Sequence, residues 1–399
     1  MKIIPAKRVS HVGEYYFSRK LSEIARLNAE REHPIINLGI GSPDGMPPHG
    51  AIERLCREAQ RHDTHAYQSY RGTAELRHAF AAWYKSYYGV GLNPDTEIQP
   101  LVGSKEGILL LSLALLDEGD KVLVPNPGYP TYTSASRLAG ATIVEYRLCE
   151  ENGWQPDFEA LERMSLEGVK LMWVNYPNMP TGAAASAELF ERLAEFGHKH
   201  NILICNDNPY SFILNDHPRS ILAAHNASEC CVELNSLSKS MNMSGWRIGM
   251  IAGRRDIIDL LLRVKSNMDS GMFRPLQSAA IEALACDAAW YKELNDEYSR
   301  RKALSARIFD LLDISYNIHS QGLFLWGRLP QRLIDAAHAI APEQCAAEVV
   351  SDAILHQCGV FLAPGFIFGS AGENHLRISL CADAELLHEA AEKIKHLKL

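Results

Sequence analysis

The sequence predicts an α/β protein with a mostly parallel sheet between helices and a smaller α+β unit toward the C-terminus. Between about residues 95 and 255, short apolar runs alternate with amphipathic stretches, which is typical of βαβ units. Residues 277–312 follow as one helical run rich in Ala, Leu, Glu and Arg. Beyond that run the strand-like pattern returns, so we expect a second, smaller unit there.

Each element is expected where its periodicity is bounded by turn residues. The seven expected strands of the sheet are residues 99–102, 121–125, 142–146, 170–175, 202–206, 231–235 and 248–252. Helices are expected between them, among others at 105–116 and 187–200. In the C-terminal unit we expect strands at 322–329 and 375–380 and a helix at 342–357.

Composition and charge exclude several classes of protein. The 399 residues carry 40 Lys and Arg against 48 Asp and Glu, a net charge of −8, which argues against a nucleic-acid partner. With 47% apolar residues the chain is not disordered, and its apolar runs are far shorter than the ~20 residues of a membrane span.

The N-terminus lacks the apolar core of a secretory signal, so we expect a cytoplasmic protein. The 9 cysteines form no C-x-x-C pair, so we expect reduced thiols and no metal site.

Polar and turn residues follow five of the expected strands. They are residues 103–104, 126–129, 178–182, 207–210 and 236–239. Ligands of an open parallel sheet bind beyond the carboxyl ends of its strands, where such loops converge. We therefore expect a ligand site at this edge of the sheet.

The loop after residue 235 holds the richest group of polar side chains, with Ser236, Ser238 and Lys239, and Arg247 eight residues beyond the lysine. A confined lysine near an arginine should have a lowered pKa, because burial and the like charge disfavour its charged form. A neutral amine is what Schiff-base chemistry needs. The alternative is a solvated basic loop.

Other positions allow both a functional and a structural interpretation. Gly103 and Ser104 begin a helix. Either the start of this helix binds an anion such as phosphate, or Ser104 is only an N-cap. Asp207 ends an apolar strand, either as a helix cap or as a buried acid that needs a cationic partner. Tyr129 is a packing aromatic or a stacking platform for a flat ring. Arg377, in the middle of a strand, binds a carboxylate ligand or forms an internal salt bridge.

Short motifs occur along nearly the whole chain. In order they are NLGIGSPD (37–44), YQSYRGTAELR (67–77), VGSKEG (102–107), NPGYPTY (126–132), NYPNMPTG (175–182), NDNPY (206–210), SLSKSMNMSGWRIG (236–249) and HLRISL (375–380). In this order and spacing they resemble the class I/II aminotransferase family, which are fold type I pyridoxal-phosphate-dependent enzymes. The resemblance implies the fold type I architecture. It also implies an enzyme that moves an α-amino group between an L-amino acid and a 2-oxo acid by a ping-pong mechanism.

The resemblance also implies a role for each matching residue. Lys239 would form the internal aldimine with pyridoxal 5′-phosphate and later move a proton between the substrate Cα and the cofactor C4′. Asp207 would pair with the pyridine nitrogen, and Tyr210 would hydrogen-bond the phenolic oxygen. Arg377 and the backbone of Gly41 would bind the substrate α-carboxylate.

The remaining implied residues hold the phosphate or the ring of the cofactor. The phosphate ligands would be Ser104, the backbone of Gly103 and Lys105, Ser236, Ser238 and Arg247. Tyr129 would stack on the ring. Tyr67 resembles the tyrosine that reaches the phosphate of the neighbouring subunit, which implies a homodimer with shared active sites.

One position departs from the family pattern. The family usually has Asn before the Pro-Thr-Gly of this motif, where it bonds the phenolic oxygen, and here the residue is Met179. A thioether is a weak acceptor and cannot donate that bond. Either Tyr210 holds the oxygen alone, which we expect, or Asn178 reaches in as a cofactor ligand from one position earlier.

The sequence is less informative about the substrate. Residues 15–27 and 266–277 lie where relatives close over the substrate or reach the partner's site. Arg274 would bind a distal carboxylate there, or is a surface residue. A lyase on the same scaffold shares nearly every motif and is the alternative to transamination. A non-catalytic regulator is more remote, because the first motif begins at residue 37 and leaves no room for a DNA-binding domain.

The resemblance divides the chain into three parts. Residues 1–45 would form an N-terminal arm and part of the small domain. Residues 46–285 would form the large cofactor-binding domain, and residues 286–399 would complete the small domain. No membrane or nucleic-acid partner is expected.

Overall fold

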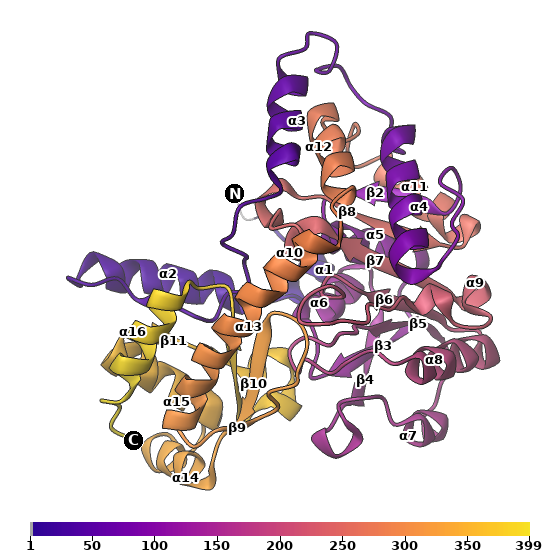
Figure 1. The fold of residues 1–399 in the computed structure, drawn as a ribbon. Coiled ribbons are helices and arrows are strands. Elements are labelled where there is room, and N and C mark those ends of the chain that lie inside the picture. Colours follow the sequence, from indigo (N-terminus) through magenta and orange to yellow (C-terminus); the bar gives the residue numbers. More distant parts are fainter. Residues whose placement is uncertain (1–2) are drawn as a thin grey trace.

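A computed structural model describes residues 3–399 of the chain (Figure 1). Its largest sheet consists of β2 (Ile98–Leu101), β3 (Lys121–Asn126), β4 (Thr142–Arg147), β5 (Val169–Val174), β6 (Leu203–Asp207), β7 (Cys231–Ser236) and β8 (Gly249–Gly253). The spatial order of these seven strands is β2-β8-β7-β6-β5-β3-β4. Strand β8 is antiparallel to both of its neighbours, and the other pairs are parallel. The expected mostly parallel seven-stranded sheet is confirmed.

Helices cover both faces of this sheet, which is why its strands are nearly continuous apolar runs. On β5, Leu171 and Trp173 pack toward one face and Met172 and Val174 toward the other, as the two-residue period of a strand requires. The first face is covered by α5 (Ser104–Leu115), α6 (Pro130–Leu138) and α11 (Arg255–Lys265). The second is covered at this point by α7 (Phe158–Arg163), α8 (Ala187–His200) and α9 (Ala227–Cys230).

Three helices extend the molecule beyond β2 and β8. They are α3 (His49–Ala59), α4 (Ala74–Tyr88) and α12 (Arg274–Leu284). Helix α12 packs against both α3 and α4, at the top of Figure 1. Their apolar side chains share one core with Ile98 and Met250 of the sheet.

The prediction of a single long helix over residues 277–312 is wrong. Helix α12 ends at Leu284, and a separate helix, α13 (Ala288–Leu311), begins after Asp287. The Asp287 carboxylate accepts a hydrogen bond from the backbone N–H of Ala289 at 2.9 Å, so it caps the new helix. The helix expected at 342–357 also begins later, as α15 (Ala346–Ala353), and continues as a π-helical turn over Ile354–Cys358.

The C-terminal part forms a second layer of strands and helices. A four-stranded sheet contains β9 (Ser315–Tyr316), β10 (Phe324–Arg328), β12 (Ala363–Pro364) and β13 (His375–Ser379). The helices beside it are α13, α14 (Gln331–Ile340), α15 and α16 (Ala384–Ile394).

The N-terminal segment packs with this C-terminal part. After α1 (Lys7–Ser10) and α2 (Tyr16–Ala29), β1 (Ile36–Asn37) pairs in parallel with β11 (Val360–Phe361). Phe17 and Leu38 lie in the same core as Phe309. The arrangement accords with a small domain built from both chain ends, while the exact boundaries stay a prediction.

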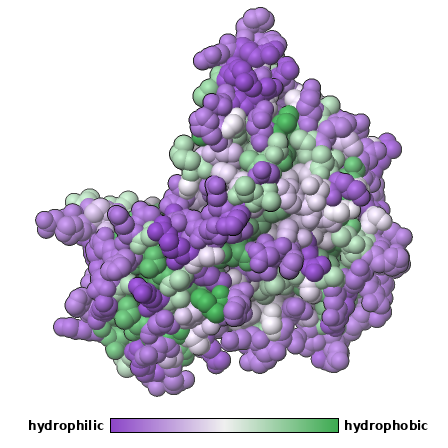
Figure 2. Space-filling view, viewed as in Figure 1, coloured by the Kyte–Doolittle hydropathy of each residue, from purple (hydrophilic) through white to green (hydrophobic). Residues whose placement is uncertain are grey.

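The surface view in Figure 2 is largely hydrophilic, with small hydrophobic patches and no continuous apolar band on the face shown. None of the helices formed by residues 3–399 is long and apolar enough to cross a membrane.

Candidate active site

A cavity of about 510 Å³ lies where the carboxyl ends of the sheet strands meet the C-terminal part. Most of the residues predicted from the sequence line it. They are Gly41, Ser104, Lys105, Tyr129, Asp207, Tyr210, Ser236, Ser238, Lys239, Arg247 and Arg377. The loops after β2, β3, β5, β6 and β7 all contribute, because parallel strands present their carboxyl ends at one edge.

Lys239 lies in α10 (Leu237–Ser240), the short helix that directly follows β7. Its Nζ donates a 2.5 Å hydrogen bond to the carbonyl oxygen of Gly41. Burial lowers the pKa of this amine, and the charges of Arg377 and Arg247 lower it further. The lowered pKa eases formation of the neutral amine, which nucleophilic attack on a carbonyl requires.

Asp207 ends β6 and is buried, and its carboxylate has one free oxygen. Oδ2 accepts a 2.9 Å hydrogen bond from the phenol of Tyr132, whereas Oδ1 has no partner among the described residues. Burial raises the pKa of Asp207 to about 7, and the hydrogen bond from Tyr132 opposes that rise. A cation brought to Oδ1 would restore the charged form, because an opposite charge favours ionisation.

Arg247 and the start of α5 form a cradle for an anion. Arg247 Nη1 donates to the carbonyl oxygen of Ser244 at 2.8 Å and lies 3.4 Å from Oγ of Ser238, which is also hydrogen-bonded to Ser236 Oγ at 2.9 Å. Gly103, with φ +76°, is the N-cap of α5, and a Cβ there would lie 2.2 Å from Arg247 Nη2. Glycine is needed so that the guanidinium can approach the helix N-terminus, where free N–H groups and the helix dipole attract phosphate.

Arg377 is a buried cation on β13. Its Nη2 donates to the carbonyl oxygen of Gly39 at 2.6 Å, and the guanidinium lies 3.9 Å from the ring centroid of Phe324. Its Nε has no hydrogen-bond partner in the described part of the chain. Burial lowers the pKa of Arg377 to about 10, so it remains charged at neutral pH. Among residues 3–399 no carboxylate lies within ion-pair distance of it. The internal salt bridge considered from the sequence is therefore absent, and a ligand carboxylate fits the free Nε.

Comparison with known proteins decides the family. A family model described as aminotransferase class I and II matches residues 33–394. The chain belongs to the class I and II aminotransferases. The enzyme is 38% identical over 395 residues to a Dehalococcoides mccartyi protein named LL-diaminopimelate aminotransferase, with 98% of each chain covered. A protein of the same name from Halothermothrix orenii is 36% identical over 393 residues, again with 98% of each covered.

Solved structures agree with this aminotransferase assignment. The fold matches apo-BacF from Bacillus subtilis with a TM-score of 0.93 and 36% identity, covering 100% of this chain and 99% of that one. It matches an aminotransferase from Staphylococcus aureus with a TM-score of 0.87 and 27% identity, covering 98% and 99%. The α/β architecture with its seven-stranded sheet is that of fold type I, and both relatives named above carry the name of an aminotransferase.

Aminotransferases of this family use pyridoxal phosphate, and the cavity fits that cofactor. The unpartnered Oδ1 of Asp207 suits a protonated ring nitrogen, and the cradle at Arg247 suits a phosphate. When bound, the cofactor supplies an electron sink for the electrons left on the substrate Cα. Lys239 lies in the same cavity with a lowered pKa, as attachment of the cofactor requires.

Asn178, the alternative to Tyr210 as a ligand of the phenolic oxygen, uses its side chain elsewhere. Asn178 does not line the cavity, because its amide is satisfied within its own turn: Nδ2 donates to the carbonyl oxygen of Asn175 at 3.2 Å and Oδ1 accepts from Thr181 Oγ1 at 2.7 Å. Met179 does line the cavity, and its Sδ lies 3.3 Å from Arg377 Nη1. Met179, the residue that departs from the family pattern, therefore faces the cavity.

Sequence reasoning missed two cavity residues that touch Asp207. One is Asn175, whose Nδ2 donates to the backbone carbonyl of Asp207 at 2.5 Å. The other is Tyr132. A signal existed for both, because Asn175 is the last residue of an expected strand and Tyr132 lies three residues after Tyr129, the N-cap of α6.

The N-terminal segment forms another wall of the cavity, in agreement with the expectation that residues 15–27 lie near the substrate. Tyr15, Phe17 and Leu21 line it. The Nζ of Lys105 lies 4.8 Å from the ring centroid of Tyr15. The substrate side chain would therefore meet an aromatic wall beside a cation.

Tyr67 and Arg274, the residues expected to serve a partner's site, do not line this cavity. Tyr67 is 90% exposed, and Arg274 is the first residue of α12. Their loops touch each other, since a Cβ on Gly271 would lie 2.4 Å from the carbonyl oxygen of Gln68. Both residues are therefore placed on one surface, and their roles stay predictions.

Proposed function

We propose that this aminotransferase transfers the α-amino group of LL-diaminopimelate, or of an amino acid of similar length with an acidic far end, to a 2-oxo acid. The observation that carries the proposal is the 38% identity, over 98% of both chains, to a protein named LL-diaminopimelate aminotransferase. Such a substrate has a second carboxylate far from the reacting Cα, so the site needs two cationic contacts.

The cavity offers those two contacts. Arg377, with its free Nε, and the backbone at Gly41 would take the α-carboxylate. The other cavity-lining cations are Lys239 and Arg247, which the cofactor requires, and Lys105. The ammonium group of Lys105, beside Tyr15, would then bind the distal carboxylate.

Within the proposed reaction, each residue acts through its position. Lys239 would carry the cofactor and, once released, would move the proton that leaves the substrate Cα. Asp207 would hold the ring nitrogen protonated, and Tyr210 would donate to the phenolic oxygen. Tyr129 would pack against the ring. A charge-assisted contact such as that of Asp207 contributes about 1.5–3 kcal/mol.

The proposed assembly is a cytoplasmic homodimer with shared active sites. Large apolar side chains are exposed on the two touching loops that carry Tyr67 and Arg274; among them, Met268 is 51% and Phe273 is 42% exposed. A second copy would cover this surface. Tyr67 would then reach the partner's phosphate site, and Arg274 would assist in binding a distal carboxylate.

The test is a half-reaction screen, in which single amino acids are added to the cofactor-loaded enzyme and the absorbance change to the pyridoxamine form is followed. LL-diaminopimelate should convert the enzyme most efficiently among LL-diaminopimelate, glutamate, alanine and phenylalanine. Lys105→Met should raise the KM for LL-diaminopimelate about tenfold or more and leave that for alanine unchanged. Phenylalanine as the best donor, or an equal effect of Lys105→Met on both donors, would contradict the proposal.

A further inference from the structure

The segment 38–46, between β1 and α3, touches two functional side chains of the cavity, Arg377 and Lys239. The carbonyl oxygen of Gly39 accepts a hydrogen bond from Arg377 Nη2 at 2.6 Å. The carbonyl oxygen of Gly41 accepts one from Lys239 Nζ at 2.5 Å. The position of this segment therefore sets the position of two backbone groups against which a substrate must fit.

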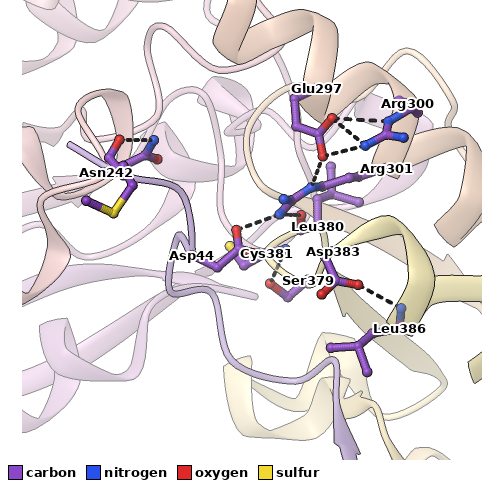
Figure 3. A network of polar contacts seen from close by, with 11 residues as sticks. Asp44, Asn242, Glu297, Arg300, Arg301, Ser379, Leu380, Cys381, Asp383 and Leu386 are labelled. Atoms are coloured by element: carbon purple, nitrogen blue, oxygen red, sulfur yellow. Dashed lines mark hydrogen bonds and ion pairs between the residues drawn. The ribbon is translucent and has the colours of Figure 1, made fainter. Parts of the chain in front are cut away.

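An ion pair whose two residues do not line the cavity anchors this segment (Figure 3). Oδ1 of Asp44 lies 2.6 Å from Nη1 of Arg301 on α13, whose side chain is only 9% exposed. The same Nη1 lies 3.4 Å from the carbonyl oxygen of Leu380, just beyond the strand that carries Arg377. Nε of Arg301 donates to Glu297 at 2.7 Å. One guanidinium thus joins the segment, strand β13 and helix α13.

We infer that Arg301 is a positioning residue for the binding of the substrate α-carboxylate, acting through Asp44. The inference rests on the proposed function, in which that carboxylate lies between Arg377 and Gly41. A binding geometry must be held within about 0.5 Å, and the walls here belong to two segments far apart in the chain. Arg301 sets their spacing, since the planar fork of a guanidinium fixes the directions of its donors, whereas a lysine ammonium rotates freely on a flexible stem.

Loss of this ion pair should displace the segment without unfolding it. Two other contacts hold its ends. The N–H of Ser379 donates to the carbonyl oxygen of Leu38 at 2.7 Å, and Nδ2 of Asn242 donates to the carbonyl oxygen of Met46 at 3.1 Å. The expected defect is therefore in substrate binding and not in the fold.

The test uses three variants, Arg301→Met, Asp44→Asn and the double variant that combines these two changes. Arg300→Met is the control. Arg300 is a matched control, because it pairs with the same Glu297 at 2.9 Å but has no contact with Asp44. Arg301→Met and Asp44→Asn should each raise the KM for both the amino acid and the 2-oxo acid about tenfold, with kcat changed less than about threefold. The double variant should be no worse than the more impaired single variant, because the two residues act as a pair. Arg300→Met should behave as wild type.

Binding readouts separate positioning from general damage. The dissociation constant of the 2-oxo acid for the pyridoxal-phosphate form, which cannot react with it, should rise by the same factor in calorimetry. Cofactor affinity and the unfolding midpoint of Asp44→Asn should stay near wild type. A fall in kcat at constant KM, or parallel loss of cofactor and stability in Asp44→Asn, would overturn the inference.

Arg377→Met distinguishes this inference from the proposed function. If Arg377→Met leaves KM unchanged, the proposed placement of the α-carboxylate is wrong. If Arg377→Met raises KM while Arg301→Met and Asp44→Asn do not, that placement stands and the positioning role of Arg301 is refuted. Should Arg301→Met fail to fold, Asp44→Asn, which preserves side-chain volume, decides the matter.

Discussion

The phenol of Tyr132 donates a 2.9 Å hydrogen bond to Oδ2 of Asp207, and both side chains are buried. The ring of Tyr132 is held by Trp173, on which it stacks with centroids 5.2 Å apart and planes 7° apart. A hydrogen bond donated to a carboxylate favours its charged form. Tyr132 therefore limits the rise in the pKa of Asp207 that burial causes.

Tyr132→Phe should raise the pKa of Asp207 and weaken cofactor binding. A hydrogen bond to a charged group contributes about 1.5–3 kcal/mol, so the dissociation constant of pyridoxal phosphate should rise about tenfold or more at pH 7. Fluorescence titration of the cofactor-free enzyme measures it. Tyr146→Phe is the control, because it removes a buried 2.7 Å hydrogen bond to the carbonyl oxygen of Trp173 away from Asp207. Equal weakening by both variants would contradict a specific role.

The stability of the cofactor-free enzyme should depend on the protonation of Asp207. Its pKa is raised to about 7 in the folded protein, against about 3.9 in the unfolded chain. The folded state thus holds a proton that the unfolded state loses, so this stabilisation is complete below about pH 4 and is lost as the pH rises to about 7. Asp207→Asn should remove the dependence and be more stable than wild type at pH 8, by up to about 4 kcal/mol. Denaturant unfolding at pH 5 and 8 tests this, with the exposed Asp216→Asn as control.

Met179→Asn should restore a hydrogen-bond donor toward the phenolic oxygen of the cofactor. A hydrogen bond of about 0.5–1.5 kcal/mol should lower the pH midpoint of the absorbance change of the bound cofactor by about 0.5–1 pH unit. The amide would stabilise the deprotonated form. Met179→Leu, which keeps the apolar volume, should not lower the midpoint. If Met179→Asn leaves the midpoint unchanged, this account of the departure fails.

Gly103→Ala should damage cofactor binding more than stability. Both Gly103 and Gly89 have positive φ, +76° and +71°, so alanine should cost about 1–2 kcal/mol of stability at either position. Only at Gly103 would the new Cβ meet Arg247, since a Cβ on Gly89 has nothing within 4 Å. We expect weaker binding of pyridoxal phosphate, by about tenfold or more, in Gly103→Ala alone. Unchanged cofactor affinity in this variant would refute the phosphate cradle.

Hybrid dimers test whether Tyr67 serves the partner's active site. Tyr67→Phe and Lys239→Ala homodimers should each have strongly reduced activity. When the two variants exchange subunits, a hybrid dimer would contain one intact site, and random exchange should restore about a quarter of wild-type activity. No recovery would mean that Tyr67 acts within its own chain or not at all. Gel filtration with light scattering establishes the dimer in parallel.

Most of the large sheet could be predicted, because strands buried on both faces are continuous apolar runs with clear turn residues between them. The break between α12 and α13 could not, since residues 285–287 keep the helical pattern and only the cap by Asp287 ends it. Asn178 was predicted as a ligand from its position in a motif, yet its amide is used by the turn. Whether a side chain faces a cavity or its own backbone depends on the local path of the chain.

The sequence by itself determined which residues follow each strand of the parallel sheet, and hence that Ser104, Asp207 and Lys239 would share one site. That inference is possible because parallel strands end at a common edge. Only the tertiary structure decided the contacts between Gly39 and Arg377, 338 residues apart, and between Asp44 and Arg301, 257 residues apart. Such contacts depend on how two packed layers are oriented, and no periodicity along the chain encodes that orientation.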